Sequence, residues 1–317
     1  MCSLFGIIDY SGTLTTREKN KILTVLSREC EIRGTDATGI AYNFGSSIHV
    51  YKRPLAARKM RFRVPNGVKV VMGHTRMTTQ GSAKHNYNNH PWATDNFALA
   101  HNGVLWNDRF LKETEELPFT PIETDSYVAV QLLEKQKTLN FDTISTMAEK
   151  VRGSFVFTIL DRQNNLYFVR GDNPLAIHRY DGFYLYASTE EILCRTEFRL
   201  RLQHQNMIET EAGDILKIDR YGRCSWNSFT LENPWTHCYL GYSQFWAEIE
   251  EETLPSNNYL TDVAQAMGVP PDDVQLLLAY GCGADEIEEL LYNPCLLHDI
   301  TSEIRCDWNG REVSTWA

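Results

Sequence analysis

Met1-Cys2-Ser3-Leu4-Phe5-Gly6-Ile7-Ile8-Asp9 opens the chain with a cysteine and a short apolar run. The apolar run predicts a buried strand. If Met1 is removed, Cys2 carries a thiol and a free α-amino group on one residue. An α-amino group titrates near pH ~8, well below the ~10.4 of a lysine, so it can accept the thiol proton directly or through one water. This pairing of nucleophile and base suits covalent catalysis, although Cys2 taken alone is more simply an ordinary small residue at a processed terminus.

The composition is that of a soluble globular protein. Its 317 residues are 43% hydrophobic and 23% charged, which fits one large domain together with a small one. No apolar run approaches the ~18 residues of a membrane helix, and the start lacks the pattern of a signal peptide. The formal net charge of −10 argues against nucleic acid as a partner, because phosphate binding needs clustered lysine and arginine. We therefore expect a cytoplasmic protein that binds neither membrane nor nucleic acid.

The eight cysteines offer no metal-binding or redox motif. None of them forms a Cys-x-x-Cys pair, so a zinc site is not expected. Without a secretion signal, the thiols are expected to be reduced, as in a cytosol. We predict a protein without metal or cofactor, and the sequence leaves its oligomeric state open.

Strands and paired helices alternate irregularly over the first ~220 residues, which predicts a layered α+β domain. Neither a repeated strand–helix–strand rhythm nor a Gly-x-Gly-x-x-Gly motif is present, so a doubly wound fold is disfavoured. The predicted helices cover 17–29, 123–133, 141–150 and 190–198. The predicted strands run from 39 onward and over 46–52, 69–73, 96–100, 154–161, 166–170, 175–179, 183–187 and 214–219.

Three polar segments adjoin these elements. The segment 74–81 predicts a loop that holds something polar, or else a surface turn. At 101–103, His-Asn-Gly follows a strand, where Asn-Gly is commonly just a hairpin turn, but an amide and an exposed N–H are also what an oxyanion hole needs. Finally, Thr124 or Asp125 could be a plain N-cap of the following helix.

The composition changes from Trp226 onward. Residues 226–258 are aromatic and acidic, and we interpret them as a connecting segment. Beyond them the pattern predicts a small helical module over 259–317, with short helices at about 260–267, 272–280 and 284–292. A spacer or docking module is the preferred interpretation of this region.

Five motifs occur in the order typical of one enzyme family. They are Met1-Cys2-Ser3-Leu4-Phe5-Gly6-Ile7, Arg33-Gly34-x-Asp36, Gly73-His74-Thr75-Arg76, His101-Asn102-Gly103 and Glu123-Thr124-Asp125. With them, residues 2–225 resemble the class II glutamine amidotransferase domain, the glutaminase part of glucosamine-6-phosphate synthase and amidophosphoribosyltransferase. The resemblance implies a four-layer αββα N-terminal-nucleophile hydrolase sandwich, here with a small helical C-terminal extension.

The resemblance also implies a role for each matching residue. Cys2 corresponds to the nucleophile that attacks the side-chain amide of glutamine, with its own α-amine as the base. Asn102 and the Gly103 N–H correspond to the oxyanion hole. Arg76 is similar to the guanidinium that receives the glutamine α-carboxylate, where a bidentate fork is favoured, and Asp125 to the carboxylate that receives the α-ammonium. By their place in the sequence, Thr79 and the His90 region fall in the substrate pocket. Arg33 and Asp36 correspond to residues that position loops.

The chain also departs from the family pattern. Met77 and Gln80 stand where the synthase branch has Trp and His, in the region that gates the glutamine pocket and the ammonia exit. After residue 226 nothing resembles an acceptor domain, and the remaining ~90 residues are too few for one.

The leading hypothesis is a glutaminase subunit that hydrolyses L-glutamine to glutamate and ammonia through a Cys2 glutamyl-thioester. Ammonia would pass to a separately encoded acceptor enzyme. One alternative is a non-catalytic protein that senses glutamine or docks a partner on the same scaffold. Another is a different N-terminal-nucleophile amidase, such as an acylase, which has no need of an Arg76 and Asp125 pair to bind both ends of a free amino acid.

Overall fold

The computed structural model describes residues 2–231 and 269–280, together with single positions between 260 and 305. The chain divides into two compact units, Met1–Pro234 and Trp235–Ala317, and each is described by itself. None of the described helices is both long enough and apolar enough to span a membrane.

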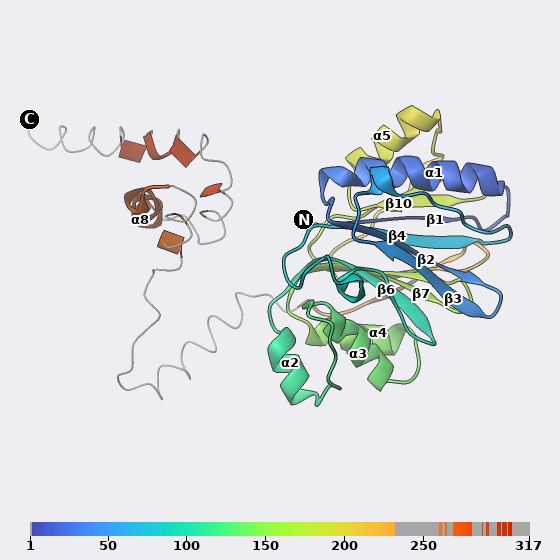
Figure 1. Cartoon of the computed structure of the whole chain (residues 1–317), viewed down its shortest axis with the longest axis horizontal. Coiled ribbons are helices and arrows are strands. Elements are labelled where there is room, and N and C mark those ends of the chain that lie inside the picture. Colours follow the sequence, from blue (N-terminus) through green and yellow to red (C-terminus); the bar gives the residue numbers. More distant parts are fainter. Residues whose placement is uncertain are drawn as a thin grey trace, which may run out of the picture. The chain divides into compact units, whose positions relative to one another are not determined.

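Two antiparallel sheets and two groups of helices build the first unit in four layers (Figure 1). The first sheet contains, in spatial order, β11 (Asn206–Met207), β9 (Ala176–Arg179), β10 (Tyr184–Ala187), β1 (Ser3–Ile8), β4 (Val70–Arg76), β2 (Ala37–Phe44) and β3 (Ser47–Arg53). The second contains β13 (Cys224–Ser228), β12 (Asp214–Ile218), β8 (Leu166–Arg170), β7 (Gly153–Asp161), β6 (Phe97–Leu105) and β5 (Trp92–Ala93).

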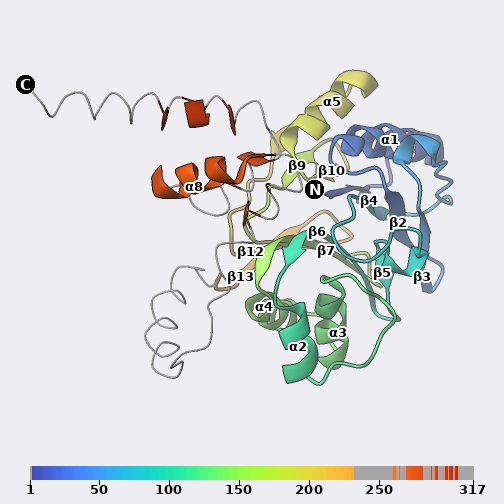
Figure 2. The ribbon, with the colours of Figure 1, turned by 60° about the vertical axis from the view of Figure 1, so that its left-hand side comes forward.

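Helices cover the outer face of each sheet. The helices over the first sheet are α1 (Thr16–Glu29) and α5 (Glu190–Leu200); those over the second are α2 (Asp108–Thr114), α3 (Tyr127–Lys135) and α4 (Phe141–Lys150). Figure 2 shows the same order, with α1 and α5 on one side of the strands and α2, α3 and α4 on the other. The predicted fold class, a four-layer αββα sandwich, is confirmed.

Three apolar cores separate the four layers. The central core lies between the sheets and includes Leu4, Met72, Ala100 and Phe168. The other two cores lie between each sheet and its helices. Strands that face two cores are apolar on both sides, which is why β1 is a continuous hydrophobic run rather than an alternating one.

Strand β1 shows how tightly these layers meet. It pairs with β10 on one side and β4 on the other, and all six of its residues are buried. Phe5 and Ile7 face the helices. Gly6 faces the other sheet. A Cβ there would lie 2.3 Å from the Val71 carbonyl oxygen of β4 and 2.4 Å from the Tyr186 ring of β10, the two strands beside β1. Any larger residue at Gly6 would force the strands or that ring apart.

Most predicted elements are present, but two strands run further than predicted. β4 continues through His74 to Arg76, and β6 continues through Gly103 to Leu105. The expected loop at 74–81 was therefore wrong as far as Arg76, and the expected turn at 101–103 was wrong throughout. Polar side chains suggested loops, yet the backbone of each segment is paired with neighbouring strands.

The predicted boundary at 225 falls inside strand β13, which pairs with β12 along its whole length. The first unit continues to Pro234. Strand β13 alternates polar and apolar residues at the edge of its sheet, so its composition resembles a connecting segment.

The second unit is described only in part. Helix α8 (Pro271–Tyr280) matches the predicted helix at 272–280. The connecting segment 232–258 and most of the predicted helices at 260–267 and 284–292 lie outside the described residues. The buried apolar residues of this unit form a core of their own, which includes Leu260, Val274, Leu277 and Ile304.

Candidate active site

Cys2 lies directly before β1, and its neighbours fix its backbone. The Arg33 Nε donates a hydrogen bond to the Cys2 carbonyl oxygen at 2.9 Å. The Cys2 thiol donates to the Met77 carbonyl oxygen, with an Sγ to oxygen distance of 3.4 Å. Burial raises the pKa of the thiol, and the nearby Arg76 guanidinium opposes this effect. The thiol is therefore the stable form near pH 7, and a base is needed to deprotonate it.

Arg76 ends β4 with its side chain 2% exposed. It donates hydrogen bonds to the Asn89 Oδ1 at 2.8 Å and to the carbonyl oxygens of Gln80 and Gly81 at 2.5 and 2.8 Å. An arginine has five N–H groups, so two of them form none of these bonds. Burial lowers the pKa of the Arg76 guanidinium, and the nearby Cys2 acts in the opposite direction. An arginine nevertheless remains charged.

Asn102 is 1% exposed in β6, and neither polar atom of its side-chain amide has a hydrogen-bond partner in the described part of the chain. An unpaired buried amide costs about 1–3 kcal/mol. Its backbone carbonyl, by contrast, accepts a hydrogen bond from the Asn173 Nδ2 at 3.1 Å. The backbone is thus held while the side-chain N–H groups stay free for another acceptor.

Gly103 adopts a φ of +143°, in the region that favours glycine. A Cβ there would lie 1.9 Å from the Ser154 carbonyl oxygen. Only glycine lets β6 approach β7 this closely directly after Asn102.

Asp125 precedes α3 and is 4% exposed. Its Oδ2 accepts a hydrogen bond from the Leu105 backbone N–H at 2.6 Å, which ties it to the end of β6. The alternative of a plain N-cap at Thr124 or Asp125 was wrong, because the N-cap position is Ser126 and no side chain caps the helix.

The loop after β4 contains Thr79, whose side chain is exposed. No hydrogen bond of the Thr79 side chain occurs among the described residues, so its place in the substrate pocket stays a prediction. The loop is held elsewhere, because the Asp36 Oδ2 accepts from the Thr78 N–H at 2.8 Å. Met77, one of the departures from the family pattern, is 51% exposed beside Cys2.

Behind these residues lies a cluster of three buried histidines, which the sequence motifs did not indicate as a group. The His74 and His90 ring centroids are 4.2 Å apart, and those of His90 and His101 are 6.4 Å apart. Burial lowers the pKa of His74 to about 3 and of His101 to about 4, and lowers the pKa of His90 as well. All three are therefore neutral at pH 7. In the sequence the three histidines are separate positions on β4, β6 and the loop between them. They meet because the two sheets pack against each other and bring β4 and β6 together.

One group of possible metal ligands occurs among the described residues, on β9 and around α5. The Nδ1 atoms of His178 and His204 each lie 2.8 Å from the same Glu197 Oε1. The Tyr180 hydroxyl donates to that oxygen at 2.6 Å. These three donors satisfy the carboxylate oxygen without an ion, and none of the residues belongs to the elements that carry Cys2, Arg76 or Asn102.

Comparison with known proteins agrees with this geometry. Residues 74–195 match the model of a family described as "Glutamine amidotransferase domain". This segment is a glutamine amidotransferase domain. The segment carries Arg76, Asn102, Gly103 and Asp125, and the resemblance to class II enzymes that was drawn from the sequence motifs is confirmed.

Curated relatives of the amidotransferase domain are longer proteins. Glutamine–fructose-6-phosphate aminotransferase from Oceanobacillus iheyensis is 30% identical over 232 residues, which cover 68% of this chain and 38% of that enzyme. The enzyme of the same name from Geobacillus kaustophilus is 31% identical over 198 residues, covering 59% and 32%. The chain thus spans less than half of the length of these relatives.

Solved structures share the fold. Glutamine phosphoribosylpyrophosphate amidotransferase from B. subtilis, complexed with ADP and GMP, is 21% identical with a TM-score of 0.58, covering 73% of this chain and 50% of that one. An allosteric regulatory enzyme of purine biosynthesis is 20% identical with a TM-score of 0.59 and the same coverage.

The histidine cluster predicts that the protein becomes less stable as the pH falls. The folded-state pKa values lie below the ordinary value of 6.5, so this contribution is complete above pH ~6.5 and is lost as the pH falls toward them. Between pH 7 and 5 we expect a loss of about 2 kcal/mol of unfolding free energy for each histidine. Urea denaturation at several pH values measures it.

The variant His101→Phe should flatten this pH dependence by the share of one histidine. His49→Gln, on the exposed face of edge strand β3, is the matched control and should leave the slope unchanged. An identical slope in wild type and His101→Phe would show that His101 is not held neutral.

Proposed function

We propose that the protein hydrolyses L-glutamine to glutamate and ammonia, with Cys2 as the nucleophile. The observation that carries the proposal is the unpaired Asn102 amide, buried at the end of the strand that also bears Gly103. A buried donor without a partner is what an oxyanion hole offers before its substrate arrives.

The charges around the site fit a free amino acid. Arg76 keeps two N–H groups for an α-carboxylate, and Asp125 supplies a negative charge for an α-ammonium. Their influence on the thiol supports their closeness to it, since Arg76 and Asp125 act on the Cys2 pKa in opposite directions. A substrate with one positive and one negative end is therefore favoured over a neutral acyl amide.

The proposed reaction has two halves. The Cys2 sulfur attacks the side-chain carbonyl carbon of glutamine, and the α-amine takes the thiol proton. Asn102 and the Gly103 N–H stabilise the oxyanion. The carbon–nitrogen bond then breaks, ammonia leaves with the transferred proton, and a glutamyl-thioester remains. Water cleaves the thioester, which releases glutamate and restores the thiol. Since burial raises the pKa of that thiol, the amine base matters for the first half.

We further propose that the ammonia is passed to an acceptor enzyme encoded separately. Residues 226–317 themselves resemble no acceptor domain. Both longer relatives carry a printed aminotransferase name, which makes nitrogen transfer the favoured use of the ammonia.

Replacing the nucleophile tests the reaction. Cys2→Ala should abolish glutamine hydrolysis, and a glutamine-like electrophile should label the wild type at Cys2 alone. Intact mass should show an active protein that starts at Cys2. Cys194→Ala is the control, because that thiol is exposed on α5, and it should retain full activity. Binding of glutamine without any turnover by the wild type would favour the non-catalytic alternative.

Two further substitutions separate chemistry from binding. Asn102→Ala should lower kcat by about 10²–10³, the typical loss for one oxyanion donor. Asp125→Asn should chiefly raise KM, since it removes the charge but keeps an oxygen for the Leu105 N–H. Asn96→Ala, exposed just before β6, is the control. A fall in kcat alone for Asp125→Asn would contradict its assignment to the ammonium.

Nitrogen transfer can be followed with glutamine labelled with ¹⁵N in its side-chain amide. With a candidate acceptor enzyme and its substrate present, we expect the label in an aminated product and a faster turnover of glutamine. Label recovered only as free ammonium with every acceptor substrate tried would contradict transfer while leaving hydrolysis intact.

A further inference from the structure

Charge is unevenly distributed along this acidic chain. The 58 residues from Ala37 to Thr94 contain nine lysines and arginines and no aspartate or glutamate, although the whole chain has a net charge of −10. This segment includes β2, β3 and β4, the outer part of the first sheet. Anions approaching that edge meet positive charge without a carboxylate from the segment itself.

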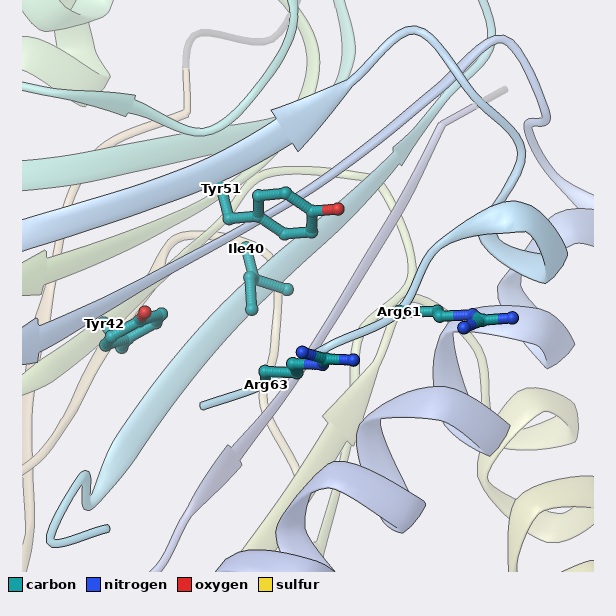
Figure 3. A pocket seen from close by; sticks show the side chains of 5 residues that line it. All are labelled: Ile40, Tyr42, Tyr51, Arg61 and Arg63. Atoms are coloured by element: carbon teal, nitrogen blue, oxygen red, sulfur yellow. The ribbon is translucent and has the colours of Figure 1, made fainter. Parts of the chain in front are cut away.

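A pocket of about 380 Å³ opens on the outer face of this part of the sheet. One wall is the sheet itself, with Ile40 and Tyr42 from β2 and Tyr51 from β3 (Figure 3). Ile40 and Tyr51 are directly paired across the two strands, so they share one face. The wall is therefore apolar and aromatic. The volume of the pocket lies within the usual range for small-molecule sites.

The other wall is the segment from Met60 to Val64, where burial alternates residue by residue. Met60, Phe62 and Val64 pack into the core beneath α1. Arg61 and Arg63 therefore point the other way, are exposed, and line the pocket (Figure 3). The apolar residues hold the segment in place and so fix the backbone positions from which both arginines extend.

Two of the neighbouring cations, Arg58 and Lys52, have partners of their own. Arg58 forms an ion pair with Glu31 at 2.5 Å, and the Lys52 Nζ donates to the Asn89 and Pro91 carbonyl oxygens. Within the described part of the chain, Arg61 and Arg63 form no hydrogen bond or ion pair. Two arginines with the same charge at one rim repel each other, and an anion between them would relieve the repulsion.

We propose that this pocket binds a nucleotide, with its phosphate on Arg61 and Arg63 and its base against the tyrosine wall. Guanidinium groups match phosphate oxygens in a bidentate geometry. The Arg53 guanidinium lies over the Tyr51 ring, 5.2 Å from its centroid, and the ring surface that it leaves uncovered offers flat apolar area to an aromatic base. Neither a free anion nor a sugar phosphate would use both walls of the pocket.

The pocket lies apart from the proposed glutaminase site. Ile40 packs toward α1, whereas its neighbour Ala41 packs between the sheets. Arg76 pairs directly with Ala37. Because Ala37 and Ala41 are four residues apart in one strand, both of them, and therefore Arg76, lie on the inner face. The nucleotide would therefore bind on the opposite face of the sheet, and its binding does not depend on the glutaminase proposal.

Calorimetric titration of the full chain at low salt tests this site, with AMP, ADP, ribose 5-phosphate and inorganic phosphate as probes. We expect AMP or ADP to bind at least about tenfold more tightly than the other two. The double variant Arg61→Gln/Arg63→Gln should weaken nucleotide binding at least about tenfold, since charged hydrogen bonds are lost. Tyr51→Ala should weaken the nucleotides but not inorganic phosphate.

Arg220→Gln/Arg223→Gln is the matched control. It removes the same charge from two exposed arginines that also lie beside a tyrosine, Tyr221, at the turn between β12 and β13. It should leave binding unchanged. An equal loss in both double variants, equal affinity for AMP and ribose 5-phosphate, or no binding of either nucleotide would each overturn the proposal.

Discussion

The pairing of β1 in the middle of its sheet is the constraint on which the rest of the site depends. Both edges of this strand are bonded to neighbours, and the Leu4 N–H also donates to the Ser188 Oγ at 2.8 Å. Both faces are buried in separate cores. Residues near a chain terminus normally fray, but Cys2 directly precedes a central strand, which fixes its position. Arg33 then fixes the Cys2 carbonyl itself.

Antiparallel pairing explains why distant motifs meet at one end of the sheets. Because β4 runs opposite to β1, its last residue, Arg76, lies beside the start of β1, where Cys2 sits. The hydrogen bond between the His74 Nε2 and the His101 carbonyl, 2.9 Å long, joins this sheet to β6 just before Asn102. Asp125 closes the group through the Leu105 N–H. Backbone geometry therefore sets the order and spacing of all four groups.

Sequence alone predicted the layered fold and the residues of the candidate site, because each motif carries its chemistry locally. It failed where polar side chains belong to strands: His74 and Asn102 look like loop residues until their neighbours are known. It also gave no sign that Asn173 and Ser188 brace the site, since their partners lie 71 and 184 residues away. Such contacts depend on register across two sheets, which local pattern does not encode.

The position of β3 gives its positive charge a second effect. β3 is an outermost strand of the first sheet, so among the described residues no strand neighbours one row of its backbone N–H and C=O groups. Exposed edges of this kind pair readily with other chains and start aggregation. Lys52 and Arg53 lie on the edge strand itself, and the arginines of the following segment flank it. Two copies that approach edge to edge would bring these cations together, and their repulsion disfavours the extension of the sheet from one molecule into the next.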